Sequence, residues 1–193
     1  MTNYDEALCF SSKTLSATQI HWRCRRLICM ILFFSFSYKG KAQSPVEYSI
    51  HANIIYHFTK YIDWPDNKKD GDFIIGVVGD TPLFDELKKV IGNKTAGNQK
   101  IIVKRFSSSN NSFDCQILFL SDEESSSLKK ISARIAESSI LLVCEDQGAA
   151  SRGACINFNI ESQRLKLEIN KINIQQHRLN IASELLRLGT VVK

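Results

Sequence analysis

Short apolar runs alternate with amphipathic segments along most of this chain, and this alternation limits the fold more than any other feature. Runs that are apolar at nearly every position occur at 72–79, 115–120 and 139–144, and a further strand is expected at 99–106. Such runs are typical of parallel strands buried between two layers of helices. Apolar side chains recur at helical spacing in 46–61, 81–91 and 124–137. The sequence therefore predicts an α/β fold, a single-domain mixed β-sheet with helices on both faces.

The last third of the chain has a different pattern. Segments 155–160 and 164–169 alternate between apolar and polar residues. This alternation predicts two antiparallel strands with one wetter face, forming a hairpin at or near one edge of the sheet. Segment 172–188 is expected to be helical.

An apolar run near the amino terminus, Leu27–Phe36, follows three closely spaced arginines and precedes a polar segment that ends at Ala42. This order of basic, apolar and small-residue regions predicts a secretory signal peptide. The run is about half as long as a membrane-spanning helix, which needs roughly 20 residues. A retained membrane anchor and a buried core helix are the alternatives. We therefore expect a signal peptide over 1–42, with an atypically long N-region, followed by one exported domain over 43–193.

The positive charge of the chain is concentrated in this leader. The whole sequence has 25 basic and 20 acidic side chains, whereas residues 43–193 have 19 and 18. A domain so close to neutral lacks the basic surface that binds polyphosphate backbones. Nucleic-acid binding is therefore not expected.

Residue patterns of common catalytic and cofactor sites do not occur in the sequence. Gly76 and Gly79 lack the G-x-G-x-x-G spacing that binds dinucleotides, and no G-x-S-x-G nucleophile elbow exists. His51 and His57 are six residues apart, so on a helix they point to nearly opposite sides and do not form a metal-binding pair. We expect no catalytic residues, no metal site and no cofactor, and we expect that the protein is not an enzyme.

Three cysteines remain after the leader. Cys144 would end a buried strand and Cys155 would open the next one, so these two are candidates for a disulfide. Cys115 would then be a free thiol. The alternative is that Cys144 and Cys155 are small buried apolar residues, as free cysteines often are.

The polar side of the expected hairpin is a candidate recognition face. Lys166, Glu168 and Asn170 alternate with apolar residues, and Ile174 follows in the last helix. A solvated face is the simpler interpretation of this alternation. Recognition is the sharper one, because the strand leads directly into that helix.

Six short motifs follow one another through the exported part of the chain. They are Tyr61–Pro65, Phe73–Gly79, Cys115–Ser121, Gly153–Phe158, Leu167–Asn170 and Ser183–Leu188. In this order they resemble the YfiR family of periplasmic proteins. Each motif is weak alone, but six in the family's order are fairly specific. The resemblance implies a small α/β domain, export to the periplasm and no catalysis.

The resemblance also implies a function. The best-known member of the family represses a membrane-bound diguanylate cyclase by acting on its periplasmic sensor domain, and it forms dimers. Reductive or envelope stress relieves the repression. We therefore expect a periplasmic regulator of an inner-membrane sensor protein, with a homodimer among its states and with effects on cyclic-di-GMP and biofilm. The alternative is a periplasmic module that binds a small-molecule ligand and feeds a sensor histidine kinase or another receptor.

The chain departs from the family at its cysteines. Cys115 matches the family's cysteine at the start of that strand, but Gly76 stands where its partner would be. Ser151 and Asn157 stand at the positions of the family's second disulfide. The family's own bridges therefore cannot form, and a bridge between Cys144 and Cys155 would be a different one.

Overall fold

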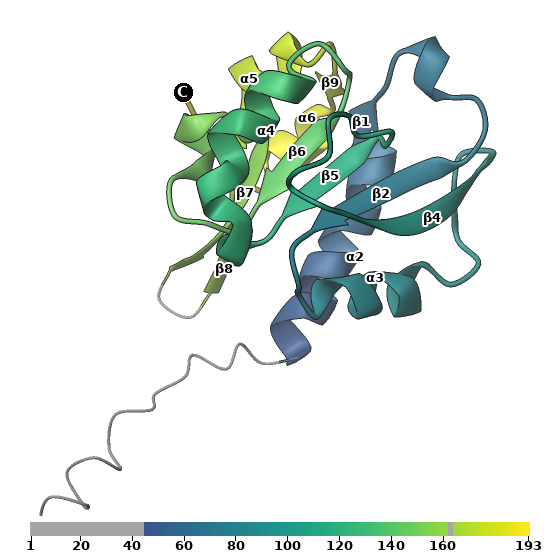
Figure 1. Cartoon of the computed structure of the whole chain (residues 1–193), viewed down its shortest axis with the longest axis horizontal. Coiled ribbons are helices and arrows are strands. Elements are labelled where there is room, and N and C mark those ends of the chain that lie inside the picture. Colours follow the sequence, from purple (N-terminus) through teal and green to yellow (C-terminus); the bar gives the residue numbers. More distant parts are fainter. Residues whose placement is uncertain (1–44, 162–163) are drawn as a thin grey trace, which may run out of the picture. The chain divides into compact units, whose positions relative to one another are not determined.

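The apolar runs form the centre of an eight-stranded sheet (Figure 1). The computed structural model describes residues 45–161 and 164–193, with side chains from Tyr48 onward. The strands of this sheet are β2 (Phe73–Val78), β3 (Thr95–Ala96), β4 (Gln99–Phe106), β5 (Ile117–Leu120), β6 (Leu141–Cys144), β7 (Ile156–Glu161), β8 (Arg164–Asn170) and β10 (Thr190–Val192). Strands β2, β5 and β6 are buried at every position, as expected for strands covered on both faces.

The strand order confirms the predicted fold class. It is β10-β8-β7-β6-β5-β2-β4-β3. Strands β4, β2, β5, β6 and β7 are parallel, whereas the β3–β4 and β7–β8 pairs are antiparallel. The predicted hairpin is therefore β7–β8. It lies one strand in from the edge, because β10 adds to β8 in parallel.

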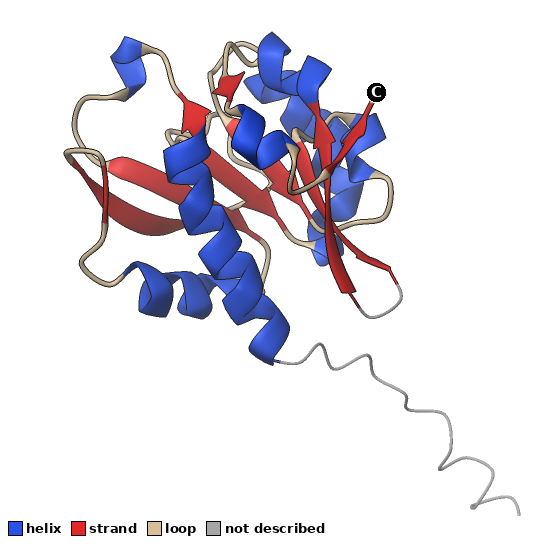
Figure 2. Ribbon diagram, turned by 180° about the vertical axis from the view of Figure 1, so that it is seen from behind, coloured by secondary structure: helices blue, strands red, loops and turns tan. Residues whose placement is uncertain are grey.

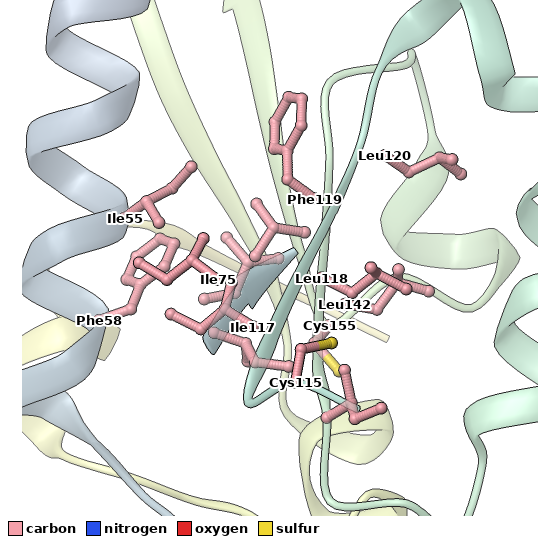
Figure 3. Close-up of a cluster of buried hydrophobic side chains, with 14 of the residues drawn as sticks. Ile55, Phe58, Ile75, Cys115, Ile117, Leu118, Phe119, Leu120, Leu142 and Cys155 are labelled. Carbon is pink, nitrogen blue, oxygen red and sulfur yellow. The ribbon is translucent and has the colours of Figure 1, made fainter. Parts of the chain in front are cut away.

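Helices cover both faces of the sheet. Helix α2 (Pro45–Tyr61) crosses one face and packs against α3 (Leu83–Ile91), whereas α4 (Leu128–Ile135) lies on the other face (Figures 1 and 2). The apolar stripe of α2 is buried against the sheet, and Figure 3 shows Ile55 and Phe58 pointing toward Ile75. The expected helix 124–137 begins instead as the 3-10 helix η2 (Asp122–Ser127), where three consecutive serines weaken α-helical geometry.

The prediction of one long helix over 172–188 is wrong. The segment forms α5 (Lys171–Gln176), the short strand β9 (Asn180–Ile181) and α6 (Ser183–Leu186), and β10 follows. Helix α5 ends where Arg178 adopts a φ of 57°. Strand β9 then pairs with β1 (Ile62–Asp63), directly after α2. These pairings use backbone groups that a continuous helix would have kept for itself.

The predicted signal peptide lies outside the described residues. No helix in the described ranges is both long enough and apolar enough to span a membrane.

Candidate functional site

The strand order reverses its direction between β2 and β5, which lie side by side in the sheet. From β2 the chain continues to β4 on one side, and from β5 it continues to β6 on the other side. In open α/β sheets, ligands bind in the crevice outside the carboxyl ends of strands at such a switch point. The carboxyl ends of β2, β5 and β6 are therefore the first place to look for a site.

A cluster of polar side chains lies at these carboxyl ends. We call it the carboxyl-end cluster, and it comprises Tyr48, His51, Thr81, Asp122 and Glu145. The Glu145 Oε1 atom accepts hydrogen bonds from the Asp122 backbone N–H at 3.3 Å and from the Tyr48 hydroxyl at 3.5 Å. The His51 Nδ1 atom lies 3.8 Å from Glu145 Oε2, beyond hydrogen-bonding distance. The first two turns of α2 are thereby joined to the ends of β5 and β6.

Burial shapes the protonation of this cluster. It raises the pKa of Glu145 to about 7 and lowers the pKa of His51 to about 4, because the charged form of each group is poorly solvated there. The imidazole of His51 stacks on the ring of Phe158, with centroids 4.5 Å apart and planes 9° apart. Both side chains are therefore held in an apolar setting that favours their neutral forms.

The switch point itself is closed. Gly79 directly follows β2 and has a φ of 102°. The Ser121 hydroxyl occupies the space beside it. A Cβ atom at position 79 would lie only 2.0 Å from Ser121 Oγ. The space that binds nucleotides in related architectures is thus filled by this chain's own side chains.

An open pocket of about 400 Å³ lies at the opposite, amino-terminal end of the strands. We call it the amino-end pocket. Its lining combines cationic, acidic and hydroxyl groups, including Lys68, Ser112, Glu137, Ser139 and Arg178. A volume of this size falls within the range of small-molecule sites. The mixture of charges suits a small polar ligand that carries charged groups.

Strained backbone lies at this pocket. Ser139 and Arg178 are the two non-glycine residues with positive φ in the described ranges, and both line it. Such conformations are unfavourable for residues with a Cβ atom and persist only where the surrounding structure holds them. His177, which directly precedes Arg178, is buried, and this burial lowers the pKa of its imidazole.

A buried glutamine joins the loop of this pocket to the sheet. The Gln116 Oε1 atom accepts from the Ile74 N–H at 2.8 Å, and its Nε2 donates to the Lys68 carbonyl at 3.0 Å. The Trp64 indole N–H donates to the Gln116 carbonyl at 3.2 Å. The Trp-Pro motif and the Cys-Gln motif, far apart in sequence, thus meet in space.

We expect Gln116→Leu to lower the free energy of unfolding by about 2 kcal/mol, because it leaves the Ile74 N–H buried without a partner and removes one of the two glutamine donors to the Lys68 carbonyl. Urea denaturation measures this change. Gln99→Leu is the matched control, since Gln99 is half-buried and donates to the same loop without binding a buried backbone N–H, so its loss should cost less than about half as much. Equal losses in the two variants would contradict the role of Gln116.

The predicted disulfide between Cys144 and Cys155 is not formed. Cys115, Cys144 and Cys155 are all free and buried. Cys155 donates its N–H to the Leu142 carbonyl, and Cys144 is paired with Asn157, so the two cysteines are offset by two residues along neighbouring strands. Burial raises the pKa of all three thiols, that of Cys115 and of Cys155 to about 12, which keeps them protonated and unreactive.

The four residues of the predicted recognition face do not share one surface. Lys166 is exposed and Glu168 is half-buried, but Asn170 and Ile174 are buried. The Asn170 side chain caps α5 by accepting the Asn173 N–H, and it donates to the Ala150 carbonyl. Ile174 packs in the core, because α5 turns its apolar side inward. In β8, more exposed and more buried side chains alternate up to Glu168, and the last two residues of the strand are both buried.

Sequence reasoning considered His51 only as half of a rejected metal-binding pair, and it missed Glu145. The available signal was a carboxylate directly after a fully apolar strand, because a residue in this position lies at the edge of the sheet where the parallel strands end. The amino-end pocket had no comparable signal, since its residues come from four separate loops. Within the described ranges, no three His, Cys, Asp or Glu side chains gather closely enough to hold a metal ion.

Comparison with known proteins adds one finding. A family model described as YfiR/HmsC-like matches residues 48–190, which include all of the motifs quoted above apart from the leader. No curated protein matches the chain.

Proposed function

This chain belongs to the YfiR/HmsC-like family, and from that membership we propose that it is an exported regulator that binds and represses the periplasmic sensor domain of a membrane-bound diguanylate cyclase. The match across 48–190 carries the proposal. The predicted signal peptide supports it, because an exported protein influences cytoplasmic signalling only through a partner that spans the membrane. Regulation, rather than catalysis, is the role that this family membership supports.

Gene deletion tests the proposal. Loss of a repressor should raise cellular cyclic-di-GMP and increase biofilm, and the full chain supplied in trans should reverse both effects. The matched control is a chain that begins at Gln43 and therefore lacks the predicted leader. It should not restore repression, because it would remain in the cytoplasm. Unchanged cyclic-di-GMP after deletion, or full rescue by the leaderless chain, would count against the proposal.

The amino-end pocket favours a second candidate function, a periplasmic small-molecule binding module that feeds a sensor histidine kinase or another receptor. The pocket has ligand-like volume, and its lining includes Lys68 and the ion pair between Glu137 and Arg178. A thermal-shift screen with small metabolites that carry charged groups separates the two functions. A repressor that binds only protein should show no shift with any of them.

For any ligand found in this way, we expect Lys68→Met to reduce the ligand-induced thermal shift by at least half, because Lys68 lines the pocket. Lys69→Met is the matched control. Lys69 is exposed and pairs with Asp63 and Asp66 rather than with the pocket, so its loss should leave the shift intact. Similar reductions in both variants would indicate general charge attraction and not binding in the pocket.

A further inference from the structure

Two titratable side chains from distant segments are buried against each other in the carboxyl-end cluster. The His51 side chain on α2 is 2% exposed, and the Glu145 side chain after β6 is 5% exposed. Within the described part of the chain, neither His51 Nδ1 nor Glu145 Oε2 has a hydrogen-bond partner. The two atoms lie 3.8 Å apart, so the acid and the base occupy the same buried space.

The surroundings of this pair offer no cation in the described ranges. Helix α2 contributes Tyr48, whose hydroxyl meets Glu145 Oε1. Helix η2 contributes the Asp122 N–H, and also the carboxylates of Asp122 and Glu123, which oppose ionisation of Glu145. Strand β7 presents only the ring of Phe158. Asp146, the next residue after Glu145, pairs with Arg152.

The pair as a whole holds one proton over a broad range of pH. With the pKa of Glu145 raised to about 7 and that of His51 lowered to about 4, the carboxyl is protonated and the imidazole neutral between these values. Free in water, with pKa values of 4.5 and 6.5, the two groups also hold one proton in total near pH 5.5.

We propose that Glu145 and His51, buried against each other, together hold one proton in the folded protein and form a compensating pair, which keeps the docking of α2 on the sheet nearly independent of pH. The pair acts by matching the number of protons bound in the folded state to the number bound in the unfolded state. Stability changes with pH only where these two numbers differ. The proposal does not depend on which partner the protein binds.

The two members act in opposite directions. The raised pKa of Glu145 stabilises the folded state at low pH, and this contribution is lost as the pH rises from 4.5 to about 7. The lowered pKa of His51 stabilises the folded state above pH 6.5, and this contribution is lost as the pH falls toward 4. Together the losses offset each other. A protein exported to a compartment that follows the external pH would keep its first helix docked throughout.

Urea unfolding of the full chain at pH 5 and pH 8 tests the pair. For each variant, the unfolding equilibrium constant is divided by that of the wild type, so that the other titrating groups cancel. From pH 5 to pH 8, this ratio should rise by roughly 30-fold for His51→Gln and fall by roughly 70-fold for Glu145→Gln. The double variant should change by less than about threefold, because the opposing contributions are removed together.

His57→Gln is the matched control, because His57 is exposed on the same helix and lies outside the buried pair. The proposal would be overturned if the ratios for His51→Gln and Glu145→Gln did not change between pH 5 and pH 8. A second measurement protects against a variant that fails to fold. In the wild type, the ring-proton NMR signals of His51 should not titrate between pH 5 and 8, and a full titration with a midpoint near 6.5 would also overturn it.

Discussion

Phe158→Ala is expected to lower the free energy of unfolding by about 4 kcal/mol, the largest stability loss that we predict for a single side chain. Phe158 is buried, and its ring contacts the imidazole of His51 at 4.5 Å, Phe58 at 6.2 Å and Phe119 at 6.4 Å between centroids. These rings come from α2, β5 and β7. Truncation therefore opens a cavity where the first helix meets the sheet, and urea denaturation monitored by circular dichroism measures the loss.

Phe158→Leu is the matched control, because leucine refills much of the space and should recover more than half of the loss. Phe84→Ala provides a second comparison. Phe84 is half-buried and contacts Lys88 and Arg105 near the surface, so its truncation should cost about 1 kcal/mol. If Phe158→Ala cost no more than Phe84→Ala, the ring cluster would not be the junction described here.

Gly79→Ala should destabilise the fold by about 3 kcal/mol or more through two separate effects. The φ of 102° is unfavourable for any residue with a Cβ atom, and the new Cβ would lie 2.0 Å from Ser121 Oγ. Thermal unfolding, followed by calorimetry, measures the sum. The expected result is a lower melting temperature with the same folded secondary structure.

Two controls separate these effects. Gly97→Ala places a Cβ at a φ of 57° with nothing within 4 Å, so it reports backbone strain without crowding. Adding Ser121→Ala to Gly79→Ala removes the hydroxyl that would clash and should recover part of the loss. If Gly79→Ala proved no worse than Gly97→Ala, the close packing of Ser121 at the switch point would have no energetic importance.

The central strands could be predicted from the sequence because burial on both faces leaves a continuous apolar run. The observed β4, Gln99–Phe106, has the predicted limits, and α2 starts within one residue of its predicted start. The prediction of one last helix was wrong because helical spacing is a local signal. Pairing of Ile181 with Ile62 and of Val191 with Ile169 is decided by partners far along the chain. Local periodicity contains no information about such partners.

The candidate site shows the same division. The sequence placed His51 and His57 on nearly opposite sides of one helix, but it did not indicate that His51 is the buried one and His57 the exposed one. Nothing local indicates that Glu145 would face His51, because their meeting depends on strand order. The prediction of a disulfide was wrong because of the strand register. Neighbouring strands do bring Cys144 and Cys155 close, but the register sets them two residues out of step.

The pairing of β1 with β9 also determines when the amino-end pocket comes into existence during folding. Strand β1 precedes all the central strands in the sequence, whereas β9 and Arg178 follow them. Contacts between segments so far apart in sequence require a large loop to close, and they form slowly. A chain whose central strands have paired but whose β9 has not yet docked therefore lacks one wall of the pocket. Any ligand of this pocket would select chains whose folding is complete.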